Sequence, residues 1–196
     1  MVHNVRGQVS EARSRLLSTA TRIFYSEGLH SVGIDRIVAE AKVTRATLYR
    51  HFASKDDLVV AYLQTVAQMD RDQVEQALGS GLPADQALRA VAQGIAAGIE
   101  SVGFRGCAFL NAAAEFPDPA HPVLNAVLEH RAWFLQTITD LFAQIEEKSA
   151  AAAARHFVML RDGAMAAGCL TDPAAVGATF LAGVEGLLTY RSGAES

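Results

Sequence analysis

Residues 33–59 read GIDRIVAEAKVTRATLYRHFASKDDLV, and this stretch decides how the chain folds. Its first apolar residues recur at spacings of three and four: Ile34, Ile37, Val38 and Ala41. That spacing gathers them on one face of a short helix. About three residues further on, the Thr44 hydroxyl can cap the start of another helix. The stretch therefore predicts two short helices joined by a tight turn, the layout of a helix-turn-helix.

The second of these helices has an apolar side and a polar side. Leu48 and Phe52 lie four residues apart, so at about 100° per residue both side chains face inward. The remaining side chains fall largely on the outer side: Arg45, Ala46, Thr47, Tyr49, Arg50 and His51. Arginine, hydroxyl groups and small apolar groups suit the edges of bases and phosphates in a DNA major groove. This outer side is the predicted recognition surface.

Two longer helices are expected to flank the motif. From Ser10 to Glu27 one apolar face is formed by Leu16, Leu17, Ala20, Ile23 and Phe24, and Gly28 ends the helix. Another helix begins at Ser54, with Asp56 and Asp57 in its first turn, where negative charge is favoured. Its apolar stripe is predicted to continue through Leu58, Ala61, Tyr62 and Met69.

Charge is distributed unevenly along the chain. The net charge of 196 residues is −4, yet residues 1–55 hold nine Lys and Arg against four Asp and Glu. The remaining residues hold eight basic and seventeen acidic side chains. A basic front on an acidic body indicates an anionic partner for the first quarter only.

The rest of the chain also has helical character, which predicts an all-α fold. Further helices are expected over residues 84–102, 106–115, 123–147, 151–169 and 173–191, and FPDPAHP at 116–122 is a rigid turn. Apolar residues make up 51% of the chain, enough for one or two packed domains. No stretch reaches the roughly 20 uncharged residues of a membrane span, and the first residues lack a signal core, so a cytoplasmic protein is expected. Cys107 and Cys169 are interpreted as small buried thiols, not as a disulfide or metal site.

The segment TLYRHFASKDDL closely resembles the N-terminal signature of the TetR family of bacterial transcriptional regulators, and the likeness extends over roughly residues 10–60. The resemblance implies a helix-turn-helix domain over residues 1–58 and a helical effector-binding and dimerisation domain over 59–196. It also implies a set of DNA-contacting residues: Gly33, Asp35, Thr44, Arg45, Ala46, Thr47, Tyr49, Arg50, His51 and Lys55. At Lys42 the family commonly has a glycine, so a lysine with the same backbone conformation would cost about 1 kcal/mol.

The resemblance further implies a homodimer formed by the last two long helices, residues 151–169 and 173–191, which are rich in alanine and glycine. Two recognition helices can then reach successive major grooves of a near-palindromic operator, about 34–36 Å apart. The function expected is that of a repressor that leaves its operator when an unidentified small molecule binds. No cofactor, metal or membrane partner is expected.

A pocket for that small molecule is expected in the second domain. Cys107, Asn111 and Glu115 are four residues apart and share a helix face, and aromatic and methionine side chains lie on neighbouring helices. The candidate lining residues are Met69, Phe104, Cys107, Asn111, Glu115, His130, Trp133, Phe134, Met159 and Met165. The alternative is that the aromatic residues form ordinary core and that Asn111 or Glu115 bonds to the loop that follows.

An enzyme and a different kind of regulator are the alternative functions. The chain has no HExxH, GxSxG or phosphate-binding glycine loop, so no catalytic residue is assigned and an enzyme is not expected. Cys107 with His121 or His130 could be imagined as nucleophile and base, but no residue that would activate the thiol accompanies them. A regulator without an effector, or an activator, stays open as the alternative to a repressor.

Overall fold

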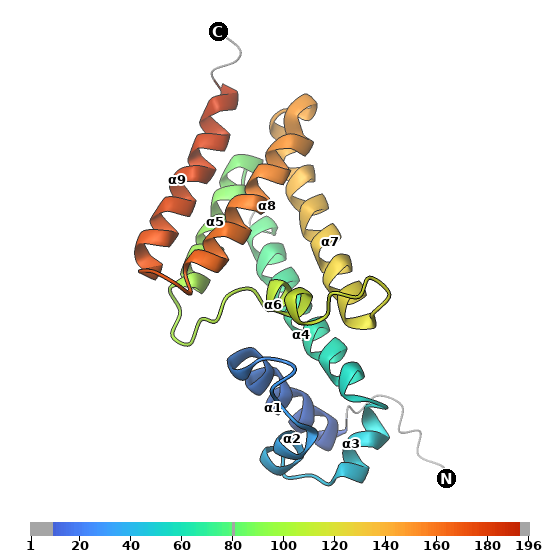
Figure 1. Cartoon of the computed structure of the whole chain (residues 1–196). Helices are drawn as coiled ribbons and strands as arrows, with labels where there is room; N and C mark the ends of the chain where they lie inside the picture. The colour runs from blue at the N-terminus through green and yellow to red at the C-terminus, as the bar shows by residue number, and fades with distance from the viewer. Residues whose placement is uncertain (1–9, 80, 193–196) are drawn as a thin grey trace, which may run out of the picture.

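The computed structural model describes residues 10–79 and 81–192, and within these ranges every regular element is a helix, which confirms the all-α prediction (Figure 1). Residues 1–9, where the predicted domain 1–58 begins, lie outside the described residues. The helices are α1 (Glu11–Glu27), α2 (Ile34–Glu40), α3 (Arg45–His51), α4 (Lys55–Leu78), α5 (Ala84–Ile99), α6 (Ala108–Glu115), α7 (Pro122–Ile145), a 3₁₀ turn (Glu147–Ser149), α8 (Ala150–Ala167) and α9 (Pro173–Ser192).

Helices α1, α2 and α3 form a small unit at one end of the molecule, called the head below (Figure 1). Its capping residues act as their sequence predicts. The Thr44 hydroxyl accepts a hydrogen bond from the Thr47 N–H at 3.1 Å, and α3 follows. The Ser54 hydroxyl accepts from the Asp57 N–H, so α4 begins one residue later than expected, at Lys55.

The turn between α2 and α3 passes through Lys42, whose φ is 53°. No other residue except glycine has a positive φ in the described part of the chain. The side chain is exposed, so nothing around it demands lysine for packing. Lysine therefore occupies a left-handed backbone position that glycine adopts at lower cost.

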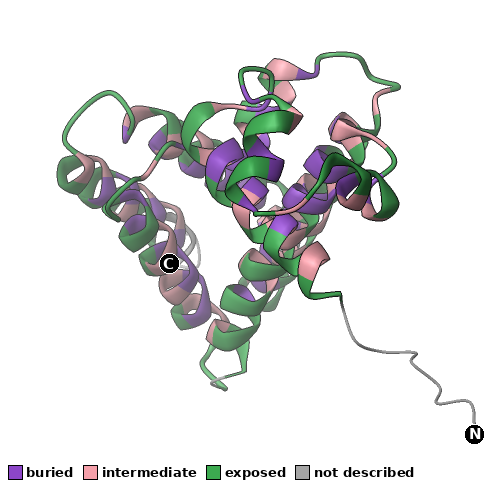
Figure 2. Cartoon of the chain, turned by 90° about the horizontal axis from the view of Figure 1, so that it is seen from below, coloured by how far each residue is buried: buried purple, intermediate pink, exposed green. Residues whose placement is uncertain are grey.

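The buried side chains form two cores, seen as the purple segments between helices in Figure 2. The first joins the head to the start of α4, to α6 and to the first turns of α7, and Leu48 and Phe52 lie within it as predicted. The second lies among the far half of α4 and helices α5, α7, α8 and α9. Helix α4 is continuous across residues 58 and 59, so the division proposed there falls inside one helix.

Two packing predictions differ from the structure. Met69 was placed on the apolar stripe of α4, but its side chain is 59% exposed. The reason is that α4 changes partners: residues up to Ala67 pack on the first core and Val74 begins the second. Cys107 is buried as expected, whereas Cys169, which follows the end of α8, is exposed.

The second core is closed by helices α5, α7, α8 and α9, which together with α6 are called the body below. Helix α9 lies along α5 and α8, and α7 lies along α8 (Figure 1). Small residues permit the closest approach, since a side chain added at Gly183 would meet Leu160 at 3.2 Å. Within residues 10–79 and 81–192 no helix has both the length and the apolar character needed to cross a membrane.

Candidate functional site

The outer face of α3 is an exposed surface of the head. Arg45, Ala46 and Arg50 are exposed, and the ring of Tyr49 is 50% exposed although it is a large aromatic group. Leu48, on the opposite side of the helix, is fully buried and holds α3 against α1 and α2. Exposed arginine and tyrosine side chains on a rigid helix are suited to enter a major groove.

Arg45 is held in place by Asp35, ten residues earlier. Its guanidinium donates to both carboxylate oxygens of Asp35 from Nε and Nη2. This hydrogen bonding lowers the pKa of Asp35, so the carboxylate stays ionised. Asp35 stands in the first turn of α2, and the pair therefore fixes one candidate base-reading side chain across the turn.

The remaining predicted DNA contacts lie around this surface in different settings. Gly33 is exposed at the start of α2 and Thr47 is half-buried beside the Thr44 hydroxyl. His51 Nε2 lies 3.4 Å from the Ser10 hydroxyl. Lys55 Nζ donates to the His30 carbonyl at 3.5 Å, and burial lowers the pKa of its ammonium group. The lysine expected to grip a phosphate is thus partly engaged with the α1–α2 loop.

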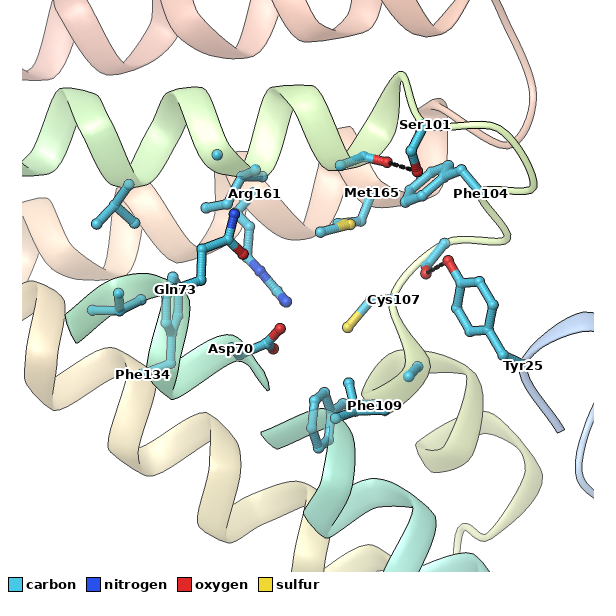
Figure 3. Close-up of a pocket in the computed structure, with 18 of the residues that line it drawn as sticks. Tyr25, Asp70, Gln73, Ser101, Phe104, Cys107, Phe109, Phe134, Arg161 and Met165 are labelled. Atoms are coloured by element: carbon cyan, nitrogen blue, oxygen red, sulfur yellow. Dashed lines mark hydrogen bonds between the residues drawn. The ribbon is translucent and has the colours of Figure 1, made fainter. Parts of the chain in front are cut away.

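A second feature is a cavity of about 840 Å³ between the head and the body (Figure 3). Thr21, Arg22, Tyr25 and Ser26 of α1 line one side, so the head itself closes the cavity. The remaining walls, which are mostly apolar, come from α4, α5, α8 and the loop before α6, with Phe109 of α6 and Phe134 of α7. Of the ten candidate lining residues, the structure brings four to this cavity: Phe104, Cys107, Phe134 and Met165.

Ionisable groups meet at one end of the cavity. The guanidinium of Arg161 lies over the Phe134 ring at 5.3 Å and donates to Asp162 at 2.9 Å. Asp162 also accepts from Arg131 at 2.8 Å. Asp70 belongs to the opposite wall, on α4, and burial raises the pKa of its carboxyl. Arg161 and Asp70 were not predicted from the sequence, because a lone arginine or aspartate in a helix is normally solvated.

The other six candidate lining residues lie outside this cavity. His130 is buried and stacks on Phe109 at 3.7 Å, and burial together with nearby arginines lowers its pKa to about 4, so it is neutral. Trp133 lies beneath the guanidinium of Arg71. Met69 and Met159 are 59% and 70% exposed because their positions on α4 and α8 face away from both cores.

Asn111 and Glu115 of α6 bond to loops. Asn111 Nδ2 donates to the Arg105 carbonyl in the preceding loop. Glu115 reaches the head instead: its carboxylate accepts from the Leu29 N–H at 2.9 Å and from the His30 N–H at 2.6 Å. The His30 ring nitrogen lies 2.7 Å from the Glu115 carbonyl. Glu115 therefore joins α6 to the α1–α2 loop.

Tyr25 makes a second link between the head and the body, which the sequence did not reveal. Its hydroxyl donates to the Gly106 carbonyl at 3.0 Å (Figure 3). The same hydroxyl accepts from the Arg105 N–H, also at 3.0 Å. Both partners belong to the loop that forms one edge of the cavity. A molecule in the cavity would thus touch the residues that hold α1 to the body.

Comparisons with known proteins agree with this architecture. The family described as bacterial regulatory proteins, tetR family, matches residues 16–62. The crystal structure of SCO4454, a TetR-family transcriptional regulator from Streptomyces coelicolor, is 66% identical with a TM-score of 0.91, covering 93% of this chain and 97% of that one. The regulatory protein TetR from Rhodobacter sphaeroides shares the fold at 23% identity and a TM-score of 0.76, covering 89% of this chain and 99% of that one.

Curated relatives match over shorter segments. The HTH-type transcriptional activator FasR of Mycolicibacterium smegmatis is 37% identical over 97 residues, which are 48% of this chain and 44% of FasR. The HTH-type transcriptional regulator UidR of Escherichia coli K12 is 33% identical over 63 residues, 32% of each. This chain thus covers less than half the length of these two relatives.

The outer face of α3, the family match over the head and the likeness of the whole chain to SCO4454 lead to one conclusion. The chain belongs to the TetR family of bacterial regulatory proteins and is a DNA-binding transcriptional regulator, not an enzyme.

Proposed function

We propose that the protein is a homodimeric repressor that binds a near-palindromic operator and leaves it when a small molecule occupies the cavity. The observation that carries the DNA-binding part is the exposed row on α3, with Arg45 oriented by Asp35 and Tyr49 projecting from the surface. In this proposal Arg45, Ala46 and Thr47 meet base edges, and Arg50 meets bases or phosphates. Backbone phosphates are bound by Thr44, Tyr49, His51 and Lys55, with Gly33 and Asp35 at the start of α2 nearby.

The proposed dimer uses α8 and α9. On α8 five exposed residues follow one another at spacings of three and four: Ala152, His156, Met159, Gly163 and Ala166. On α9 four exposed small residues follow one another at spacings of three and four: Ala175, Ala178, Ala182 and Gly186. Nothing lies within 4 Å of a side chain added at Gly163 or Gly186, so each faces open space that a partner helix could fill. The exposure of Met159 is explained if it packs against a second copy.

The release step would be a population shift. A molecule that fits the cavity better when the two heads stand at the wrong spacing for successive grooves favours that state and weakens DNA binding. Support comes from the contacts of the cavity with the head, since Tyr25 both lines the cavity and bonds the loop at residues 105 and 106. Movement of that loop would therefore displace α1 through the Tyr25 hydrogen bonds.

The DNA-binding surface can be tested by an electrophoretic mobility-shift titration with the native operator at fixed salt. Arg45→Ala combined with Tyr49→Ala removes a base-reading group and a phosphate-binding group, so operator affinity should fall at least about a hundredfold. Lys148→Ala is the matched control, because it removes an exposed positive charge far from the head. Unchanged affinity of the double variant would overturn the assignment of α3.

The direction of regulation is tested in the same system. A reporter placed behind the operator should be silenced by the protein, whereas FasR is named an activator. Increased transcription on addition of the protein would show that it is not a repressor. The assignment of the DNA-binding surface does not depend on that result.

A further inference from the structure

We propose that the cavity binds an amphipathic organic anion, an apolar body carrying one carboxylate that pairs with Arg161. The inference rests on the proposed function in one respect: the bound anion is taken to be the effector that releases DNA. The binding itself requires no operator.

The first argument is the charge of Arg161. The residue is 7% exposed, and its guanidinium stays protonated at any relevant pH. Among the described residues, Arg161 donates one hydrogen bond to a side-chain oxygen, from Nη1 to Asp162. Because Asp162 also serves Arg131, two guanidinium groups share one carboxylate. Arg131 is 34% exposed, so water also solvates its charge, whereas Arg161 is buried. The other carboxylate that attracts Arg161, Asp70, forms no ion pair with it within 4 Å among the described residues. An anion at this end would therefore complete the pairing of a buried charge, and buried charges are normally paired.

The second argument is the direction of the free donors. Figure 3 shows the guanidinium of Arg161 reaching from α8 into the space between Asp70, Cys107 and Met165. Besides its bond to Asp162, the guanidinium interacts with the Cys107 thiol, a weak acceptor, so the planar group still has N–H donors for a stronger one. Its planar fork is the geometry that binds the two oxygens of a carboxylate. A carboxylate placed there would complete the hydrogen bonds of a buried arginine.

The third argument is the apolar character of the remaining wall. Val66, Val91, Ile95, Phe104, Phe109 and Phe134 line the cavity. Its volume of about 840 Å³ falls within the range of small-molecule sites. An aliphatic or aromatic body of the ligand would be buried against these side chains, with its single polar group at the Arg161 end.

Asp70 is the group that could favour a different ligand, because a cation would pair with it. Arg161 attracts Asp70 but forms no ion pair with it within 4 Å among the described residues. The titratable neighbour of Asp70 at 3.3 Å is His130, whose lowered pKa leaves it neutral. The Asp70 side chain is 36% exposed, so water already solvates it in part. Its carboxyl can also take up a proton when an anion enters, whereas Arg161 cannot lose one. The cavity therefore favours an anion over a cation.

Three probes with the same ten-carbon chain test the head group: decanoate, decan-1-ol and decan-1-amine, each below its micelle-forming concentration. Equilibrium dialysis against the full chain should give a Kd for decanoate at least about tenfold lower than that for decan-1-ol, since a charged hydrogen-bonded pair replaces a neutral one. Decan-1-amine should bind most weakly. Equal affinities of decanoate and decan-1-ol, tightest binding of the amine, or no binding of any probe would each overturn the proposal.

The variant Arg161→Met tests whether the preference for decanoate depends on the Arg161 guanidinium. The variant keeps the volume and apolar stem, so decan-1-ol should bind as before while the advantage of decanoate disappears. Arg155→Met is the matched control: it removes an exposed guanidinium on the same helix that does not line the cavity, and the advantage should persist. If Arg161→Met fails to fold, the comparison of the three probes on the unaltered chain still decides.

DNA binding separates this inference from the proposed function. If decanoate binds with the expected preference but leaves the operator complex intact, the cavity binds organic anions, and the proposal that such a ligand releases DNA is wrong. If no probe binds while the operator is bound normally, the ligand class fails and the DNA-binding function stands.

Discussion

At the scale of single residues, Lys42 is the position where the chain departs from the pattern of its family. Its φ of 53° means that lysine holds a left-handed backbone conformation, at a cost of about 1–2 kcal/mol. Lys42→Gly removes that cost but increases the freedom of the unfolded chain. We expect the free energy of unfolding to rise by roughly 0.5–1 kcal/mol, measured by urea denaturation.

Lys42→Ala separates backbone strain from charge, because alanine removes the ammonium group and keeps the strain. Its stability should stay within about 0.5 kcal/mol of the original chain. If alanine stabilises the protein as much as glycine does, strain at this residue is not the cause.

The departure at Lys42 and the inward position of Leu48 and Phe52 could be predicted because both depend on neighbouring residues in the sequence. The bond between Arg45 and Asp35 could not, since it depends on how α2 packs against α3. Arg161 was missed for a similar reason. Helical spacing gives the direction of a side chain on its own helix but does not show that Asp162, Arg131 and a cavity surround it.

At the scale of elements, helix limits were predicted to within about three residues, because caps, prolines and apolar spacing are local signals. The role of α6 was not predicted. Its polar face was assigned to a pocket, but Asn111 fastens the preceding loop and Glu115 fastens the head, 86 residues earlier in the chain at Leu29. Such partners depend on tertiary packing, which periodicity does not report.

Glu115 gives the prediction at this scale. Glu115→Ala leaves the Leu29 and His30 N–H groups without their acceptor, so the free energy of unfolding should fall by about 2 kcal/mol. Glu115→Gln keeps one oxygen and should lose about half as much. Hydrogen exchange of the Leu29 and His30 amides should accelerate in both variants, while amides in α8 stay protected.

Glu129→Ala serves as the control for Glu115, because this exposed acid on α7 forms no ion pair with the described residues. It should change neither stability nor exchange. If Glu115→Ala leaves exchange at Leu29 unaltered, the carboxylate does not join α6 to the head.

At the scale of the whole molecule, the chain combines three parts: a DNA-binding head, a cavity closed partly by α1, and a body whose α8 and α9 expose small residues. The family match covers residues 16–62, which are most of the head and the first turns of α4, and the likeness to SCO4454 extends over nearly the whole chain. In the proposed release step, a molecule bound in the cavity would act on α3 through Tyr25 and α1, which contacts α3.

The central claim is that two copies of this chain present two recognition helices to one operator. The most direct measurement is hydroxyl-radical footprinting on the operator found by genome-wide mapping, with the stoichiometry of the complex determined on the same DNA. The account predicts two protected half-sites related by two-fold symmetry, their centres one helical turn or a multiple of it apart, with an even number of chains bound. A single unsymmetrical half-site occupied by one chain would contradict it.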